Sequence, residues 1–347
     1  MIVALLLAGL LTISLFANLG LLLSNSLPDL GAGGGGGGAG MRRMPLEEMV
    51  VEPSSGRDKI AQIDVTGMIA NMQLDASGLT MVKYIENQFE RAGTDDAVKA
   101  VLLKVDSPGG EVMASDDIYK IIKEFQEEYD KPVVASMGNL AASGGYYVSA
   151  PCAWIVANEL TMTGSIGVIM QTYNLRRLMD RYGVVPMTFK SGKHKDMLSM
   201  SKKPEEIDNE ERKIVEDFIN TTFTRFKDVI RTGRETALEI NEGAGRELVE
   251  DWEKYADGRI LDGTKAYELG LVDELGGIDV AIARAEQLAG IENARIVRYN
   301  RPFNLGSLFG ILGKAPSSET TVKLDLGIRL PELKVGQPYY LPSMYAE

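Results

Sequence analysis

The pattern of apolar and polar positions begins with a strongly apolar stretch. From Ile2 to Leu23 the chain is almost wholly apolar, and no charged side chain occurs before Asp29. A helix of about 22 residues at 1.5 Å rise would cover about 33 Å, enough to cross a hydrocarbon core of about 30 Å. We therefore expect residues 1–28 to form one transmembrane anchor. A cleaved signal peptide and a soluble core helix are the alternatives.

A glycine-rich segment separates this apolar stretch from the rest of the chain. Eight of the ten residues from Gly31 to Gly40 are glycine. Such a segment cannot bury apolar surface and behaves as a flexible coil. We therefore expect residues 29–56 to link the anchor to a folded domain. The C-terminal tail, residues 301–347, has no clear period and is expected either to contact a neighbouring subunit or to remain free.

Apolar runs of strand length alternate with stretches of helical periodicity in the middle of the chain. Strands are expected at 60–69, 97–106, 132–137, 153–158, 165–170 and 185–190. Helices are expected at 79–93, 112–129 and 205–231. Strands that alternate with helices form βαβ units and a largely parallel sheet. The pattern therefore predicts one α/β domain over residues 57–300.

Composition narrows the functions that this domain could have. The 347 residues include 49 acidic and 37 basic side chains, and the resulting net charge of −12 argues against non-specific nucleic-acid binding. One histidine (His194) and one cysteine (Cys152) allow no intrachain disulfide and no zinc site of the usual type. A Ser-His-Asp or Cys-His enzyme would have to use His194. We expect no metal and no cofactor.

Two segments that follow predicted strands carry candidate catalytic groups. In Asp106–Gly110 (DSPGG), the flexible backbone could present the Gly110 N–H to an oxyanion; a plain strand-to-helix turn is the alternative. In Asn139–Tyr147 (NLAASGGYY), Ser143 could project its hydroxyl into a cleft beside the Gly144 N–H. A helix start that needs small residues for close packing is the alternative for this second segment.

Two further segments supply a second serine and a basic group. Thr163–Gly167 (TGSIG) is a turn that contains Ser165, and Lys190–Met197 (KSGKHKDM) contains Lys195. A lysine in apolar surroundings has its charged form disfavoured, so its pKa can fall toward about 7–8 and the amine becomes a usable general base. A solvated face is the alternative for this lysine-rich run. Nearby methionines could line an apolar pocket or simply belong to the core.

In this order, the four segments resemble the signal peptide peptidase A family. The later segments Gly258–Gly263 (GRILDG) and Gly270–Asp273 (GLVD) are also similar to that family. Its members are bacterial and archaeal serine peptidases that use a Ser-Lys dyad on a crotonase-like, or Clp-protease-like, α/β fold. The resemblance covers roughly residues 59–290. The 52-residue separation of Ser143 and Lys195 is similar to that of the short, single-domain members.

The resemblance implies a role for each matching residue. Ser143 would be the nucleophile, Lys195 the general base that later protonates the leaving amine, and Ser165 the hydroxyl that orients the lysine. The backbone N–H groups of Gly110 and Gly144 would form the oxyanion hole. A dyad of this kind needs no histidine.

Three other polar groups are expected to have no catalytic role. Neighbouring residues of an extended strand point to opposite faces, so if Lys195 faces Ser143, His194 does not. Asp106 is expected to cap the turn that follows it rather than to act as a triad acid. Cys152 is expected to be a small buried hydrophobe, since as a nucleophile it would lack a base.

The resemblance also implies a substrate, an assembly and a location. The substrates would be cleaved signal peptides and other hydrophobic peptides, degraded through an acyl-enzyme. Family members form closed ring or dome oligomers in which each single-domain chain supplies one site, often completed by neighbours, so we expect a homo-oligomer. The catalytic domain is expected outside the cytoplasm, anchored by one membrane span, although Arg42 and Arg43 slightly favour the opposite orientation.

Two other functions stay open on the sequence. A crotonase-fold acyl-CoA enzyme would share the Gly-Gly turn and the GLVD segment, but acyl-CoA chemistry needs neither an anchor nor the lysine-rich run. A catalytically inactive membrane scaffold would need none of the candidate residues, all of which are present.

Overall fold

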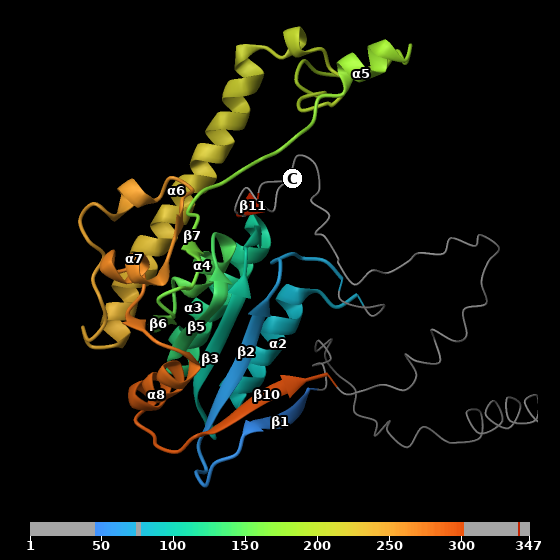
Figure 1. The fold of residues 1–347 in the computed structure, drawn as a ribbon. Helices are drawn as coiled ribbons and strands as arrows, with labels where there is room; N and C mark the ends of the chain where they lie inside the picture. Colours follow the sequence, from blue (N-terminus) through green and yellow to red (C-terminus); the bar gives the residue numbers. More distant parts are fainter. Residues whose placement is uncertain (1–45, 74–77, 302–338, 341–347) are drawn as a thin grey trace, which may run out of the picture. The chain divides into compact units, whose positions relative to one another are not determined.

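The computed structural model describes residues 46–73, 78–301 and 339–340 (Figure 1). Its strands are β1 (Glu47–Glu52), β2 (Lys59–Thr66), β3 (Val98–Ser107), β4 (Gly110–Glu111), β5 (Val133–Ala141), β6 (Trp154–Ala157), β7 (Thr163–Gly164), β8 (Ile260–Leu261), β9 (Glu274–Leu275), β10 (Arg295–Asn300) and β11 (Tyr339–Tyr340). Its α-helices are α2 (Met81–Thr94), α3 (Val112–Tyr129), α4 (Gly144–Ser149), α5 (Arg176–Arg181), α6 (Asn209–Ile240), α7 (Gly263–Glu268) and α8 (Ile278–Ala289). Two short 3₁₀ helices are η1 (Pro204–Glu206) and η2 (Trp252–Tyr255).

A seven-stranded sheet forms the centre of the described structure, in the order β1-β10-β2-β3-β5-β6-β9. Each pair of neighbours from β10 to β9 is parallel, and only β1 at the edge runs antiparallel to its neighbour. The expectation of an α/β fold with a largely parallel sheet is confirmed. The shorter pairs β7–β8 and β4–β11 are separate from this sheet.

The side chains of the central strands alternate between two apolar cores. On β3, Ala100 and Leu102 pack in a cluster with Ala281 of α8, whereas Val101 and Leu103 pack in a larger cluster on the opposite face. This period of two is what a strand that is buried on both faces requires. Helices therefore cover both faces of the sheet, with α8 on one face and α2, α3, α4 and part of α6 on the other.

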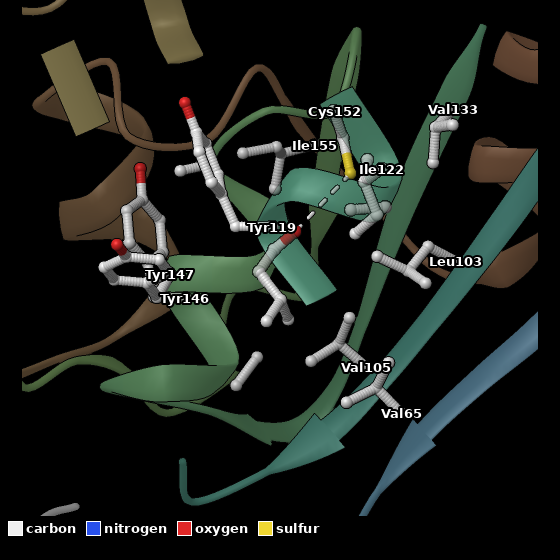
Figure 2. Close-up of a cluster of buried hydrophobic side chains, with 14 of the residues drawn as sticks. Val65, Leu103, Val105, Tyr119, Ile122, Val133, Tyr146, Tyr147, Cys152 and Ile155 are labelled. Carbon is white, nitrogen blue, oxygen red and sulfur yellow. Dashed lines mark hydrogen bonds between the residues drawn. The ribbon is translucent and has the colours of Figure 1, made fainter. Parts of the chain in front are cut away.

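The larger core holds the short helix α4 against α3 and the sheet (Figure 2). Tyr146 and Tyr147 of α4 are fully buried, and the Tyr147 ring lies 5.0 Å from that of Phe226 on α6. Cys152 is buried in the same cluster, its thiol 4.0 Å from the carbonyl oxygen of Val148, and burial raises the pKa of this thiol. The expectation that Cys152 is a buried small hydrophobe is confirmed.

Residues 167–225 form a part that we call the arm. In Figure 1, α5 and the N-terminal half of α6 extend beyond the sheet. Glu211 is the one buried residue between 167 and 225, so the arm has almost no core of its own. We refer to the rest of the described chain, without β11, as the body.

Several expectations from the pattern of apolar residues need correction. Residues 165–170 and 185–190 do not form the expected strands, because their backbone, apart from a single bridge residue at Ile169, pairs with no strand in the described part of the chain. The long helix is shifted and extended relative to the expected range 205–231, since Asp208 accepts a hydrogen bond from the Glu211 N–H and caps its start. Strand β1 lies inside the range 29–56 that was expected to be linker, and it pairs with β10.

The expected anchor, residues 1–28, and most of the glycine-rich linker lie outside the described residues. Within the described part of the chain, no helix combines the length and the apolar character that crossing a bilayer requires. Of the tail at 301–347, the structure describes Arg301 and the strand β11.

Candidate active site

Ser143 occupies a strained turn between β5 and α4. Its backbone has φ 55° and ψ −116°, a conformation that costs a residue other than glycine about 1–3 kcal/mol. The Ser143 N–H donates to the Gly164 carbonyl at 2.8 Å, and the Ser143 carbonyl accepts from the Tyr147 N–H at 2.9 Å. The residue is fully buried, yet among the described residues its Oγ has no hydrogen-bond partner. A sharp strand-to-helix turn is one way in which hydrolases present a nucleophilic serine.

The two candidate oxyanion donors lie next to each other. A Cβ atom on Gly144 would lie 3.1 Å from the Gly110 nitrogen and 3.0 Å from the Gly109 Cα. A Cβ atom on Gly110 would lie 1.8 Å from the Ile69 carbonyl oxygen, so only glycine fits there. The carboxyl ends of the neighbouring parallel strands β3 and β5 bring these segments together. Such ends are where open α/β sheets commonly bind ligands.

The strand β11 pairs with β4 beside this point. The two are antiparallel, with Tyr340 opposite Gly110. On its other side β4 bonds to Ile69, because the Glu111 N–H donates to the Ile69 carbonyl and the Gly109 carbonyl accepts from the Ile69 N–H. Alternation along a strand therefore turns the Gly110 N–H toward the side on which β11 lies. An extended segment of this chain thus occupies the edge that carries a candidate oxyanion donor.

Ser165 lies close to Ser143 in the body. It directly follows Gly164, whose carbonyl accepts the Ser143 N–H, and it is itself buried with φ 48°. Its own N–H donates to the Arg259 carbonyl at 2.7 Å. The later segment that begins at Gly258 therefore holds Ser165, which links the GRILDG segment to the site.

Lys195 lies in the arm and is exposed, whereas Ser143 is buried in the body. Because Ser143 Oγ has no partner among the described residues, one copy of the described chain does not bring the two side chains into hydrogen-bond contact. Lys195 is in a turn, not in the extended conformation from which His194 was expected to point away from Ser143, and its N–H donates to the Gly192 carbonyl at 3.3 Å. The dyad stays a prediction.

Ion pairs hold the turn of Lys195 against the start of α6. Lys193 lies 2.9 Å from Asp208, and Lys202 pairs with the buried Glu211. The hydrogen bond from Lys193 lowers the pKa of Asp208 to about 2, and the same contact raises the pKa of Lys193. Within the described part of the chain, Lys195 itself makes no ion pair.

The other groups weighed on the sequence have structural contacts. One carboxylate oxygen of Asp106 accepts the Leu140 N–H at 3.2 Å, so its side chain bonds to the neighbouring strand β5, which leads to Ser143, and not to the turn that follows Asp106 as expected. His194 Nε2 lies 3.6 Å from a carboxylate oxygen of Glu210, at the surface of the arm.

One group of residues has the composition of a metal site. Among the described residues, His194, Asp208 and Glu211 bring one potential ligand atom each to within 4.8 Å of one another. Both carboxylates already accept hydrogen bonds from lysines and from backbone N–H groups. This arrangement gives no support to a metal centre, and the expected absence of a metal stays a prediction.

Two acidic residues near Ser143 were not singled out by the sequence. Glu111 directly follows the DSPGG segment and is buried, and only that position could have drawn attention to it. Asp116 accepts hydrogen bonds from the Tyr147 hydroxyl at 2.6 Å and from Arg225 at 3.1 Å. Burial alone would raise the pKa of Asp116, but hydrogen bonds from Lys120, Tyr147 and Arg225 lower it overall.

A family model and several relatives identify one family. The model of peptidase family S49 matches residues 125–292. A Synechocystis sp. protein named as a protease is 39% identical over 243 residues, which cover 70% of this chain and 79% of that protein. An Enterococcus faecium protein named as a signal peptide peptidase SppA is 36% identical over 258 residues, covering 73% of this chain and 70% of that one.

An archaeal relative extends this similarity. A Methanocaldococcus jannaschii protein named as a protease is 38% identical over 229 residues, covering 66% of this chain and 68% of that protein. The matched family range includes Ser143, Ser165 and Lys195, though Gly110 precedes it. The chain therefore belongs to peptidase family S49 and is a serine-type peptidase of the SppA kind.

Proposed function

We propose that this protein is a membrane-anchored serine endopeptidase that degrades cleaved signal peptides and other hydrophobic peptides with a Ser-Lys dyad. The observation that carries the proposal is the fully buried hydroxyl of Ser143, on a strained turn and without a partner among the described residues. A buried hydroxyl that lacks a hydrogen bond is destabilising unless a partner or a substrate arrives. The adjacent N–H groups of Gly110 and Gly144 offer the charge stabilisation that acyl transfer requires.

In the proposed reaction, Lys195 in its neutral form takes the proton of Ser143 as Oγ attacks the scissile carbonyl carbon. The Gly110 and Gly144 N–H groups stabilise the oxyanion, and Ser165 orients the lysine. Lys195 then gives the proton to the leaving amine, which departs as the acyl-enzyme forms. Water, deprotonated by the same lysine, hydrolyses the ester and restores Ser143.

The dyad is proposed to form between two copies of the chain in a homo-oligomeric ring or dome. Within one copy the described arm leaves Lys195 exposed and Ser143 without a partner. The arm also exposes large apolar side chains, with Val185, Met187 and Phe189 between 73% and 89% accessible. Exposed apolar surface of this kind is typical of protein contacts. A second copy that covers this surface would place the Lys195 of one copy against the Ser143 of the other.

A peptide substrate is proposed to bind as an added strand on β4. The pairing of β11 with Gly110–Glu111 supports this mode, because it shows that the edge accepts an extended backbone. Exposed methionines from segments that adjoin β4 and β5, Met72, Met113 and Met162, supply adaptable apolar contacts. Both features favour hydrophobic peptides over acyl-CoA substrates.

The N-terminal stretch, residues 1–28, is proposed to anchor the enzyme as a single membrane span, with a catalytic domain of the crotonase-like, Clp-protease-like fold outside the cytoplasm. The support for this is the apolar sequence and its glycine-rich linker.

Mixing two inactive variants tests the mechanism. Ser143→Ala and Lys195→Ala should each lose cleavage of a fluorogenic hydrophobic peptide, and a fluorophosphonate probe should label the wild type but not Ser143→Ala. Co-expression in equal amounts should restore about a quarter of the wild-type activity, because each half of a shared site comes from the intact parent half of the time. Full activity of Lys195→Ala would contradict the dyad. Two inactive variants that stay inactive when mixed would contradict a site shared between copies.

A further inference from the structure

Glu111 is a buried carboxylate beside the candidate oxyanion hole. Its residue is 6% exposed, and among the residues that the structure describes no lysine or arginine forms an ion pair with it. Burying a carboxylate without a cation costs several kcal/mol unless hydrogen bonds compensate. A negative charge near the site also opposes the formation of an oxyanion. The residue therefore needs a structural reason for its place.

The contacts of Glu111 fasten a neighbouring segment to the oxyanion strand. One carboxylate oxygen accepts the Asn71 N–H at 3.0 Å. The Glu111 N–H donates to the Ile69 carbonyl at 2.7 Å, and the Ile69 N–H donates to the Gly109 carbonyl at 2.8 Å. Three hydrogen bonds thus tie Ile69–Asn71 to Gly109–Glu111.

This fastened segment sets the position of Gly110. The Ile69 carbonyl oxygen lies only 1.8 Å from the point that a Cβ atom on Gly110 would occupy, so the two backbones touch. A shift of the Ile69–Asn71 segment would therefore change the direction of the Gly110 N–H. The carbonyl of Glu111 also accepts the Ser115 hydroxyl at 2.9 Å, and Ser115 Oγ lies 2.7 Å from the Cβ position of Gly144.

The direction of the carboxylate agrees with this role. Glu111 is the N-cap residue of α3, but its side chain makes no capping hydrogen bond to that helix and reaches Asn71 instead. The first turn of α3 contains no acidic residue. A carboxylate that capped α3 would offset the positive end of an 18-residue helix next to Gly110. Turned toward Asn71, the carboxylate bonds to the Ile69–Asn71 segment and not to the helix that follows it.

We propose that Glu111 is a positioning residue that fixes the Gly110 donor through the Ile69–Asn71 segment. This proposal rests on the proposed function, because it matters only if Gly110 stabilises an oxyanion. The carboxylate acts through its length and its hydrogen-bond acceptor rather than through its charge.

Three substitutions at Glu111 separate these properties. Glu111→Gln keeps the length and an acceptor oxygen without the charge, and is expected to retain kcat within about threefold. Glu111→Asp keeps the charge, but its shorter side chain moves the carboxylate away from the Asn71 N–H. Glu111→Ala removes the carboxylate altogether. Both are expected to lower kcat about 10- to 100-fold with KM within about threefold, since a misplacement of about 1 Å can cost 10²-fold. The exposed Glu128 on the same helix gives the control Glu128→Ala, with wild-type kinetics.

A second measurement reports on the oxyanion hole itself. A peptide aldehyde forms a hemiacetal with Ser143 whose oxygen takes the place of the oxyanion. Its inhibition constant should rise in Glu111→Asp by the same factor by which kcat falls, whereas KM stays near that of the wild type. If Glu111 only supports folding, its substitution would lower the melting temperature, but the inhibition constant would not rise by the factor by which kcat falls. If Glu111→Ala does not fold, the comparison of Gln with Asp carries the test.

The outcomes are distinguishable from a failure of the proposed function. Wild-type kcat in Glu111→Asp, a loss confined to KM, or Glu111→Gln as impaired as Glu111→Asp would each overturn the proposal. If the wild type cleaves no peptide, or if Ser143→Ala cleaves as well as the wild type, the proposed function fails first.

Discussion

The body around Ser143 and the arm that carries Lys195 hold their functional groups in opposite ways. Around Ser143, backbone hydrogen bonds and touching backbones leave no space for a methyl group at Gly110. In the arm, from 167 to 225, Glu211 is the one buried residue. Exposed lysines such as Lys193 pair there with acidic side chains. The nucleophile is therefore held by close packing, whereas the turn that contains the candidate base is held by ion pairs of its neighbours Lys193 and Lys202.

This difference indicates which of the two groups of the proposed site a single copy of the chain can position. Close packing resists displacement by fractions of an ångström, because every shift opens a void or forces an overlap. Exposed ion pairs contribute only about 0–1 kcal/mol each and weaken with salt. The body can position Ser143 alone, whereas the arm needs a second surface before Lys195 has a defined place.

The largest effect is expected from a buried ion pair of the body. Arg234 pairs with Asp273, both side chains are almost fully buried, and Asp273 also accepts the Ile155 N–H at 2.8 Å. Arg234→Met should lower the free energy of unfolding by about 3–5 kcal/mol, because it leaves a buried charge unpaired. Urea denaturation measures the loss, and Lys193→Ala in the arm should lower the free energy of unfolding far less, because its ion pairs are exposed to solvent. Equal losses in the two variants would contradict the comparison.

The next largest effect concerns catalysis. Gly110→Ala should lower kcat/KM by about 10²–10³-fold, since the new methyl group would overlap Ile69 and displace an oxyanion donor. In the arm, a Cβ atom on Gly192 would meet nothing within 4 Å, so Gly192→Ala should stay within about threefold of the wild type. Steady-state kinetics of both variants with one peptide substrate test this difference in kcat/KM. Similar activities would mean that packing around Gly110 is not what positions the donor.

A smaller effect is expected from removing the strand that pairs with β4. Deleting residues 339–347 frees the edge at Gly110–Glu111. If β11 occupies the edge in part of the molecules, only the remaining fraction can bind substrate, and the apparent affinity is reduced by that fraction. The deletion should therefore lower KM about 2- to 10-fold. Kinetics of the full-length and shortened enzymes test this. An unchanged or higher KM would place the substrate elsewhere.

The smallest effect concerns Asp116, which connects the two regions through Tyr147 of the body and Arg225 of the arm. Its hydrogen bonds hold its pKa in the folded state below the ordinary value. A lowered pKa stabilises the fold above the unfolded-state pKa of about 3.9, and this stabilisation is lost as the pH falls through the folded-state value. The difference in thermal unfolding between wild type and Asp116→Asn should therefore be largest at pH 7 and should shrink as the pH falls below about 3.9. A difference that does not shrink as the pH falls below that value would exclude this origin.

The sequence predicted the body better than the arm. The apolar run of β3 and the helical spacing of apolar residues in α3 consist of the side chains that form the core, so both elements were expected nearly where they lie. The run at 185–190 was predicted to be a strand because it has the apolar composition typical of strands. A strand also needs a neighbouring strand to pair with its backbone hydrogen-bonding groups. Within one described chain that partner is missing.

The candidate site divides in the same way. The positions of Ser143, Gly110 and Gly144 follow from the carboxyl ends of neighbouring parallel strands, which the order of elements predicts. The contact of Asn71 with Glu111 depends on how a loop lies on β4, and no periodicity encodes it. The place of Lys195 could not be predicted from one chain, because the proposed site needs a second.

The length of α6 has a mechanical consequence. Its 32 residues at 1.5 Å each make a rod of about 48 Å, capped by Asp208 at its N-terminal end, and Gly233, about two turns before its C-terminal end, packs on Ala150. Each residue added between these points would turn the far end by about 100° and lift it by 1.5 Å. Seven added residues would restore the direction to within about 20° but lengthen the reach by about 10 Å. The number of residues in α6 therefore sets both the distance and the direction at which the arm holds Lys195 relative to the body.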